Sequence, residues 1–200
     1  MNLSAMLANA LTFFLVANPI GNSPAIIAIV KDFDFKQQKK ILLRESIFAL
    51  VLALFFQYFG ELFLTGLKIE DFAVTITGGL LLLLVAYSMI FPNNVTSDTA
   101  TKHQKQEPFF VPIATPIISG PGLLAIIMLK TKLAADDFMI SSAILVAWIG
   151  VFIVLTSAPY LQKVLGKRGL TALEQVMGMI LALIATEMVV KGVAMFYKTF

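Results

Sequence analysis

The sequence predicts an all-α polytopic membrane protein, with six transmembrane helices arranged as a 3+3 inverted repeat and two of them discontinuous. Three observations lead to this fold class. The 200-residue chain is 58% hydrophobic and only 14% charged. Apolar runs of membrane-spanning length recur along it, and two of these runs are broken by prolines at matching positions.

Lipid is the solvent that this composition requires. A mean hydropathy of +0.89 leaves more apolar surface than a soluble domain of this size can bury. Each apolar run can cross about 30 Å of hydrocarbon at about 1.5 Å per residue, and each is too long and uniform for a barrel strand. A helix satisfies its own backbone in lipid. The six predicted spans are 4–30, 46–67, 73–91, 109–129, 138–160 and 172–195.

Composition argues against several function classes. The chain has no cysteine, so disulfides, thiol catalysis and cysteine-based metal sites are excluded. The single histidine, His103, lies in a polar stretch, and we expect neither a metal nor a cofactor. No nucleophile is paired with a base inside the spans, so we expect no enzyme. The net charge of +3 gives no indication of nucleic-acid binding. The first apolar run lacks a basic leader and a cleavage pattern, which predicts a retained span.

Basic residues predict the orientation, because cytoplasmic loops carry the excess of lysine and arginine. Ten of them flank one side of the predicted spans: Lys31, Lys36, Lys39, Lys40, Arg44, Lys102, Lys105, Lys163, Lys167 and Arg168. The other side has five: Lys68, Lys130, Lys132, Lys191 and Lys198. Both termini are therefore expected to face the periplasm.

The proline breaks occur as a pair. Asn18-Pro-Ile-Gly-Asn-Ser-Pro24 interrupts the first span, and Thr115-Pro-Ile-Ile-Ser-Gly-Pro121 interrupts the fourth at an offset of 97 residues. A second echo relates Thr77-Gly-Gly-Leu-Leu-Leu-Leu83 to Met177-Gly-Met-Ile-Leu-Ala-Leu183 at an offset of 100. Self-similarity at a fixed spacing indicates an internal duplication. The glycines of this echo, Gly78, Gly79 and Gly178, predict close helix packing without ligand contact.

The duplication divides the chain into three parts. Residues 1–92 form a first three-helix repeat, 93–107 a cytoplasmic connector, and 108–200 a second three-helix repeat. Three spans is an odd number, so the second repeat enters the membrane from the opposite face. Broken helices at matching positions of an inverted repeat indicate the substrate site of a secondary transporter. Two structural explanations stay open: proline kinks are common in membrane helices, and duplication can leave symmetry without a transport site.

Backbone chemistry shows what each break offers a ligand. Proline lacks an N–H and displaces the carbonyl four residues earlier. Pro24 therefore frees the Ile20 carbonyl and Pro121 frees the Ile117 carbonyl; the carbonyls of Leu15 and Pro112 are freed in the same way. Unpaired carbonyls in hydrocarbon need a side chain, water or a ligand. The residues predicted to bind substrate are Asn18, Pro19, Gly21, Asn22, Ser23, Thr115, Ser119, Gly120 and Gly122.

Each break also restarts a helix. Ser23-Pro24 and Gly120-Pro121 each predict an N-cap followed by proline at the first helical position. Helix N-termini favour negative charge and freed carbonyls favour positive charge, so the breaks suit the two ends of a zwitterion. The glycines permit close backbone approach and favour a small ligand. Chloride, a carboxylate or water would use similar groups.

Carboxylates at the ends of apolar runs are the candidates for ion coupling, because ionised side chains there are costly and usually partnered. Glu45 follows Arg44 at a membrane edge, where Arg44 can reach the surface while Glu45 points inward. Glu187 lies four residues before Lys191, which predicts a local ion pair near the outer interface. Glu45 and Glu187 are therefore proposed for coupling, with proton and sodium both open.

Together these motifs resemble the MarC family of bacterial inner-membrane proteins, the SnatA-like neutral amino acid transporters. The resemblance covers essentially the whole chain. It rests on Asn18-Pro-Ile-Gly-Asn-Ser-Pro24, Arg44-Glu45, Ile76-Thr-Gly-Gly79, Glu107-Pro-Phe-Phe-Val-Pro-Ile-Ala114, Pro116-Ile-Ile-Ser-Gly-Pro121 and Leu173-Glu-Gln-Val-Met-Gly178. It implies six spans in the inner membrane and, for SnatA-type members, uptake of glycine or alanine driven by an ion gradient. Many relatives have aspartate where this chain has Asn18, which removes one acid from the site.

The function predicted from these features is secondary transport of a small neutral amino acid. The expected partners are the lipid bilayer, a small zwitterionic solute and a coupling ion, either a proton or sodium. Two alternatives stay open: a channel or exporter of small metabolites on the same scaffold, and a membrane scaffold that transports nothing. The sequence leaves open the exact substrate, the direction of transport, the oligomeric state and any role in antibiotic resistance.

Overall fold

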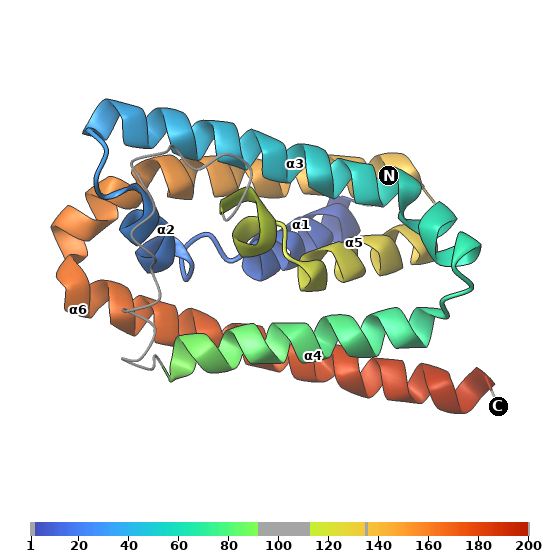
Figure 1. Cartoon of the computed structure of the whole chain (residues 1–200). Helices are drawn as coiled ribbons and strands as arrows, with labels where there is room; N and C mark the ends of the chain where they lie inside the picture. Colours follow the sequence, from blue (N-terminus) through green and yellow to red (C-terminus); the bar gives the residue numbers. More distant parts are fainter. Residues whose placement is uncertain (1–2, 92–112, 135, 200) are drawn as a thin grey trace.

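The computed structural model of the chain describes residues 3–91, 113–134 and 136–199, and these residues form helices joined by short turns (Figure 1). The elements are α1 (Leu3–Ala17), α2 (Ser23–Val30), α3 (Phe35–Gly66), α4 (Asp71–Ile90), η2 (Ile113–Ile118), α5 (Pro121–Leu133) and α6 (Asp137–Thr199). Several predictions lie outside the described residues: the connector 93–107 with Lys102, His103 and Lys105, and the Pro112 carbonyl.

Four helical segments of the described chain are long and apolar enough to cross a bilayer: Phe35–Gly66, Asp71–Ile90, Asp137–Leu161 and Arg168–Thr199. The last two are arms of α6. Gly166 separates them with φ 62° and ψ −178°, a conformation that glycine adopts without a Cβ clash. The chain reverses its direction there, so the two arms run antiparallel (Figure 1).

Helix α3 begins well before the predicted span 46–67. Its N-cap is Asp34, whose carboxylate accepts a hydrogen bond from the Gln37 N–H at 3.1 Å. A cap of this kind satisfies one of the unpaired N–H groups of the first turn. The basic segment after α2 is therefore largely helical, and hydropathy identified only the apolar part of α3.

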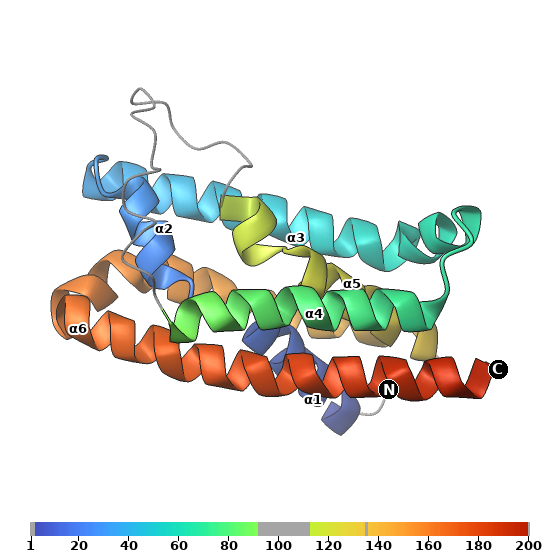
Figure 2. The ribbon, with the colours of Figure 1, turned by 60° about the horizontal axis from the view of Figure 1, so that its bottom comes forward.

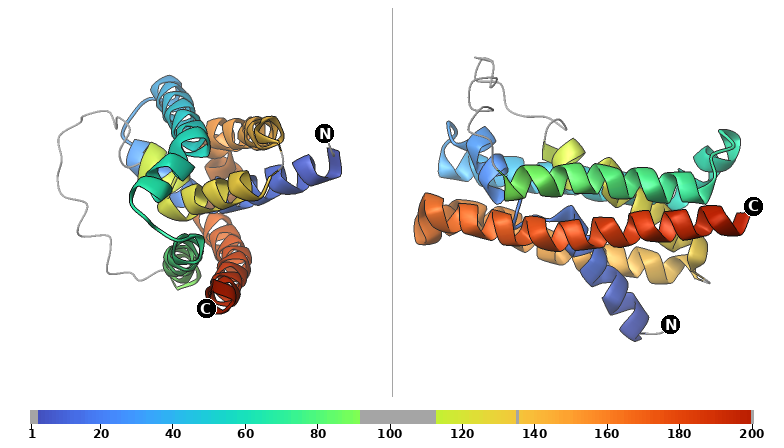
Figure 3. Two further views of the ribbon diagram at one scale, coloured as in Figure 1. Left: turned by 90° about the vertical axis from the view of Figure 1, so that its right-hand side faces the viewer. Right: turned by 90° about the horizontal axis from the view of Figure 1, so that it is seen from below.

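Two long pairs of helices enclose the short elements. α3 packs on the first arm of α6, and α4 packs along the second arm. α2, η2 and α5 lie between these pairs (Figures 1 and 2). The end-on view in Figure 3 shows α5 near the middle of the bundle and α1 crossing it obliquely. The centre therefore holds α5 and the C-terminal end of α1, while the N-terminal part of α1 reaches outward, with Leu3 and Leu11 exposed.

Glycines bring α4 close to α6. A Cβ added at Gly79 would lie 2.9 Å from the Ala185 carbonyl oxygen, and one added at Gly178 would lie 3.2 Å from the Ala86 carbonyl oxygen. Such contacts are closer than real Cβ atoms normally make, so the two backbones approach as only small residues permit. This confirms the packing role predicted for these glycines.

The bundle has a buried core and an apolar outer face. Trp148, Phe13 and Ile26 are buried, and the indole N–H of Trp148 donates to the Ser46 carbonyl at 3.0 Å. Large side chains point outward along the spans; Leu62 is 70% exposed and Leu183 is 73% exposed. An apolar surface of this extent suits contact with lipid.

Charged residues gather at the two ends of the bundle. At one end, Lys39 joins the start of α3 to the first arm of α6: its ammonium donates to the Tyr160 hydroxyl at 3.1 Å and lies 5.1 Å from the centre of the Phe35 ring. At the other end, Lys132 of α5 pairs with Asp71 of α4 at 2.8 Å. Polar ends on an apolar middle are the distribution expected of a membrane protein.

Candidate central solute site

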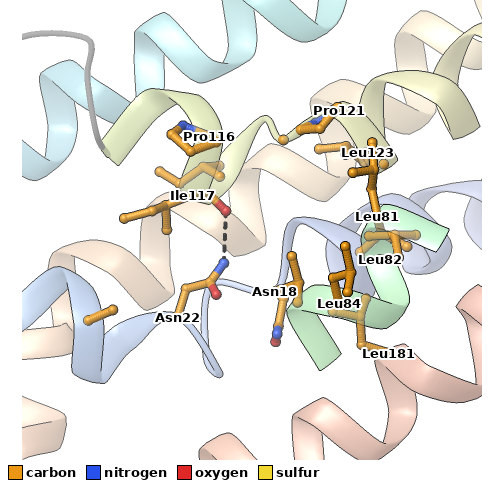
Figure 4. A pocket seen from close by; sticks show the side chains of 16 residues that line it. Asn18, Asn22, Leu81, Leu82, Leu84, Pro116, Ile117, Pro121, Leu123 and Leu181 are labelled. Atoms are coloured by element: carbon orange, nitrogen blue, oxygen red, sulfur yellow. Dashed lines mark hydrogen bonds between the residues drawn. The ribbon is translucent and has the colours of Figure 1, made fainter. Parts of the chain in front are cut away.

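The segments that join α1 to α2 and η2 to α5 lie together in the middle of the bundle. Both line one cavity of about 350 Å³, which we call the central cavity. The first break contributes Asn18 and Asn22, and the second contributes Ile117 of η2 and Pro121 of α5 (Figure 4). Gly120 also lies on the wall. Residues about 97 positions apart in the sequence therefore meet at the same place.

Asn18 shapes the end of α1. Its φ is 49°, in the left-handed region that asparagine tolerates better than most residues. The Asn18 carboxamide accepts from the Gly21 N–H at 3.2 Å and donates to the Met89 sulfur of α4, also at 3.2 Å. Asn18 is buried, so its side chain closes the turn and holds that turn against α4.

Asn22 links the two proline breaks. Its amide nitrogen donates to the Ala17 carbonyl at 3.1 Å and to the Ile117 carbonyl at 2.9 Å, and Figure 4 shows the second of these bonds. The Ile117 carbonyl is the one that Pro121 is predicted to free. The first break therefore supplies the hydrogen-bond donor that the second break requires.

The helix starts agree with the sequence in one break and differ in the other. Gly120 is the N-cap of α5 and is followed by Pro121, as predicted. In the first break, Ser23 was predicted as the N-cap, but α2 begins at Ser23 and its N-cap is Asn22. The prediction is wrong by one residue, because the Ser23 hydroxyl donates to the Pro19 carbonyl at 2.7 Å and so satisfies that carbonyl instead of capping a helix.

The polar side chains of the second break are used within the protein. Thr115, with φ −139° and ψ 136°, interrupts η2, and its hydroxyl donates to the Ser119 carbonyl at 3.2 Å. The Ser119 hydroxyl is buried and donates to the Ala49 carbonyl of α3 at 2.8 Å. Ser119 therefore fixes the break to α3, whereas Thr115 bonds within the break itself.

The predicted substrate-binding residues fall into two groups. Those on the wall of the central cavity are Asn18, Asn22, Gly120 and Gly122. Those not on its wall are Pro19, Gly21, Ser23, Thr115 and Ser119. Gly21 and Ser23 are buried behind the wall. The second group therefore supports the shape of the cavity.

One wall of the cavity is apolar and was not predicted from the sequence. Leu81, Leu82, Leu84 and Val85 of α4 line it, with Leu181 of α6. Gly122 allows this wall to approach, since a Cβ added there would collide with Leu82 Cγ. The segment 77–83 was part of the second sequence echo, but its leucines resemble any lipid-facing run. Only the packing of α4 against α5 shows that these leucines line the cavity.

The two coupling candidates lie in different surroundings. The Glu45 side chain is 0% exposed, and its Oε1 lies 3.3 Å from Arg44 Nε. Its other oxygen, Oε2, has no hydrogen-bond partner within the described residues. Glu187 is 63% exposed and pairs with Lys191, which confirms the predicted ion pair. Neither carboxylate lines the central cavity.

The cavity wall has no charged side chain among the described residues. The same part of the chain has no group of three or more His, Cys, Asp or Glu residues that could hold a metal. What the wall offers is two carboxamides, backbone groups of the breaks and an apolar surface. Such a wall suits a small solute with no net charge.

Fold and site together define an integral membrane protein whose apolar helices line a partly open cavity, with no charged side chain on its wall among the described residues. The chain belongs to the MarC family: the family model described as MarC family integral membrane protein matches residues 3–197.

Curated relatives agree over nearly the full length. An inner membrane protein of Escherichia coli strain K12, UPF0056 inner membrane protein YhgN, is 34% identical over 98% of this chain and 100% of its own. A UPF0056 membrane protein of Buchnera aphidicola from Acyrthosiphon pisum is 32% identical with the same coverage. One from Chlamydia trachomatis is 36% identical over 92% of this chain and 90% of its own. No solved structure matches the chain significantly.

Proposed function

We propose that this protein is a secondary transporter of a small neutral amino acid, of the glycine or alanine type, coupled to an ion gradient across the bacterial inner membrane. The observation that carries the proposal is the meeting of the two proline breaks on one cavity, with Asn22 of the first bonded to the Ile117 carbonyl of the second. Membrane transporters place their substrates where broken helices of two repeats meet.

The proposal includes six crossings in two inverted repeats, with α1–α2 and η2–α5 as the two broken spans. α1 and α2 have 15 and 8 residues, together about 35 Å of helix, which suffices for a bilayer core of about 30 Å. η2 and α5 have 6 and 13 residues, together about 28 Å by the same rise. In Figure 1, α3 runs opposite to the first arm of α6, and α4 opposite to the second. This supports the inversion.

A zwitterion would find complementary groups in the central cavity. Gly122 and Leu123, in the first turn of α5, line the cavity, and N–H groups in the first turn have no partner inside their own helix. They suit the carboxylate of the solute. The carboxamide oxygen of Asn22 and the carbonyls of the breaks suit its ammonium group. The leucines of α4 contact a small apolar side chain, which favours alanine over a strongly polar solute.

We further propose that Glu45 carries the coupling proton. It is buried at 0% exposure, and it lies one helical turn before Ala49, whose carbonyl binds Ser119 of the second break. A change of charge at Glu45 would therefore act on the same face of α3 that holds the break. Glu187, which is exposed and paired, is the second candidate, and a sodium gradient is the alternative driving force.

Uptake by the purified protein in liposomes tests the function. Labelled glycine or alanine should accumulate under a proton or a sodium gradient and stop when an ionophore collapses it. Asn18→Ala and Ser119→Ala should weaken uptake, while Thr186→Ala, which removes an exposed hydroxyl on α6, should not. Flux that never saturates and ignores ionophores would indicate a channel instead. The absence of any gradient-dependent flux would reject the proposal.

A further inference from the structure

A second cavity, of about 320 Å³, lies toward the end of the bundle that holds the Lys132–Asp71 pair. We call it the outer cavity. Four helices line it, with Thr12 from α1, Thr75 from α4, Lys130 from α5, and Glu187 and Lys191 from α6. By the distribution of basic residues, this end is the periplasmic one.

The two cavities differ in chemistry. The central cavity has no charged side chain among the described residues, whereas the outer cavity has one carboxylate and two ammonium groups. Glu187 is 63% exposed and Lys191 is 64% exposed, so neighbouring side chains do not enclose this ion pair. Their pairing can therefore be exchanged for pairing with a solute that carries both charges.

A thin packed layer separates the cavities. Thr75 and Leu82 line the outer and the central cavity respectively, and seven residues of helix span about 10 Å. Between them on α4 is Gly78, where an added Cβ would lie 2.6 Å from the Cβ of Ala125 and 3.2 Å from the Cε of Met188. One side chain from each of α5 and α6 thus closes against the Gly78 backbone.

We propose that the outer cavity is a second binding site, at which a zwitterionic amino acid waits before it passes the Gly78–Ala125–Met188 layer to the central cavity. Glu187 binds the ammonium group of the solute, and Lys130 with Lys191 binds its carboxylate. The identity of the solute rests on the proposed function. The site provides what the uncharged central cavity lacks, a charged surface that selects zwitterions from water before they lose their hydration.

Cysteine labelling tests the site without requiring transport. The chain has no cysteine, so Thr12→Cys and Leu129→Cys, both half-buried on the wall of the outer cavity, each place one thiol there. A membrane-impermeant thiosulfonate added from the periplasmic side should label both. Alanine should slow this labelling saturably, and propionate or ethylamine, which have one charge each, should protect much less. Thr65→Cys, exposed at the same end, should react without any protection.

Variants of the charged groups give an independent readout. Glu187→Gln and Lys130→Gln should each raise the alanine concentration for half-maximal protection by roughly tenfold, the size of one charge-assisted contact. In uptake, Lys130→Gln should raise KM and leave kcat unchanged, because it acts before the central cavity. Lys198→Gln, at the exposed end of α6, is the matched control and should change neither.

The outcomes separate this proposal from the proposed function. Uptake by the wild-type protein, with no protection of the thiol in Thr12→Cys or in Leu129→Cys, would overturn the outer site and leave transport intact. Protection without uptake would retain the outer site and reject transport. Failure of the reagent to label either variant would show that the outer cavity is closed to periplasmic water, which also overturns the site. Equal protection by propionate and alanine would reject zwitterion recognition.

Discussion

The carboxamide of Asn22 is the single side chain that bonds one proline break to the other within the described part of the chain. It donates to the Ala17 and Ile117 carbonyls at 3.1 Å and 2.9 Å. A carbonyl that loses its donor at this depth in the membrane is costly unless water or a solute reaches it. Asn22 therefore joins the end of α1 to η2, directly before the break that precedes α5.

Asn22→Ala should lower the free energy of unfolding by about 1–3 kcal/mol, since it leaves two carbonyls without their donor. Thermal unfolding in detergent measures this loss. Uptake should fall as well, because the cavity wall loses its link between the breaks. Thr186→Ala removes an exposed hydroxyl that bonds only within its own helix and should leave the unfolding temperature unchanged. An Asn22→Ala variant as stable and active as the wild type would contradict this role.

Gly122 sets the width of the central cavity. An added Cβ would collide with Leu82 Cγ, so Gly122→Ala should destabilise the protein by about 1–3 kcal/mol through overpacking. Because Leu82 is the obstructing side chain, Gly122→Ala should cost much less stability in a Leu82→Ala background than in the wild type. A double-mutant cycle of unfolding free energies measures the coupling. Gly66→Ala, which meets nothing within 4 Å, is the control, and additive effects would contradict the contact.

At the scale of single residues, the sequence predicted where the helices break better than it predicted which groups form hydrogen bonds there. Proline chemistry identified the Ile117 carbonyl, which does accept a bond from a side chain. Only spatial proximity could show that Asn22 is that donor and that the Ser119 hydroxyl is used on Ala49 of α3. Hydrogen-bond partners so far apart in the sequence depend on how the helices pack, and no local pattern encodes that.

At the scale of the elements, the seam between α4 and the second arm of α6 depends on small residues. Beside Gly79 and Gly178, Gly192 lies where an added Cβ would come within 3.2 Å of the Phe72 carbonyl oxygen. Helices in lipid gain little from the hydrophobic effect between themselves, so close backbone contact supplies much of their association. The seam runs along the cavity wall that α4 provides.

Gly79→Leu should therefore separate α4 from α6 and lower stability by at least about 1–3 kcal/mol. The obstructing atoms include the Ala185 carbonyl oxygen and the Val189 nitrogen, which are backbone atoms and cannot rotate away. Unfolding temperature and the yield of folded protein in detergent measure the effect. Gly66→Leu places the same side chain in open space and should have little effect. Equal stability of the two variants would show that the seam tolerates separation.

Element boundaries illustrate why hydropathy locates spans but not helices. The predicted span 46–67 lies largely inside α3. That helix begins at Phe35, with Asp34 as its N-cap, so its first turns are helical although their basic side chains make them polar. The chain reverses at Gly166, inside the loop predicted between the spans 138–160 and 172–195. The second arm of α6 begins at Arg168, before the apolar run that predicted the last span. Hydropathy reports the solvent around a segment, whereas capping and backbone geometry determine where a helix ends.

On the scale of the whole molecule, helix length and composition identify four candidate spans in the described chain, whereas the proposed function needs six crossings. The difference rests on whether α1 with α2, and η2 with α5, cross the membrane as broken pairs. α1 is apolar but has only 15 residues, too few for a crossing of about 30 Å. Its apolar length becomes sufficient only if α2 continues it beyond the Asn18 turn.

Cysteine accessibility from the two sides of the membrane separates these topologies. If α1 and α2 cross together, Leu3→Cys, which is exposed near the N-terminus, should react with an impermeant thiol reagent only from the periplasm. Asp32→Cys, exposed just after α2, should react only from the cytoplasm. Leu133→Cys, exposed at the end of α5, should be labelled from the same side as Leu3→Cys, and Val164→Cys, exposed near the Gly166 reversal, from the same side as Asp32→Cys.

Intact cells and inverted vesicles provide the two sides for this measurement, and the cysteine-free wild type is the blank in each. If Leu3→Cys and Asp32→Cys reacted from the same side, the first pair would be re-entrant and the two repeats would not be inverted copies. The central cavity would then have access from one side only. Such a cavity could bind a solute, but it could not alternate between two faces of the membrane.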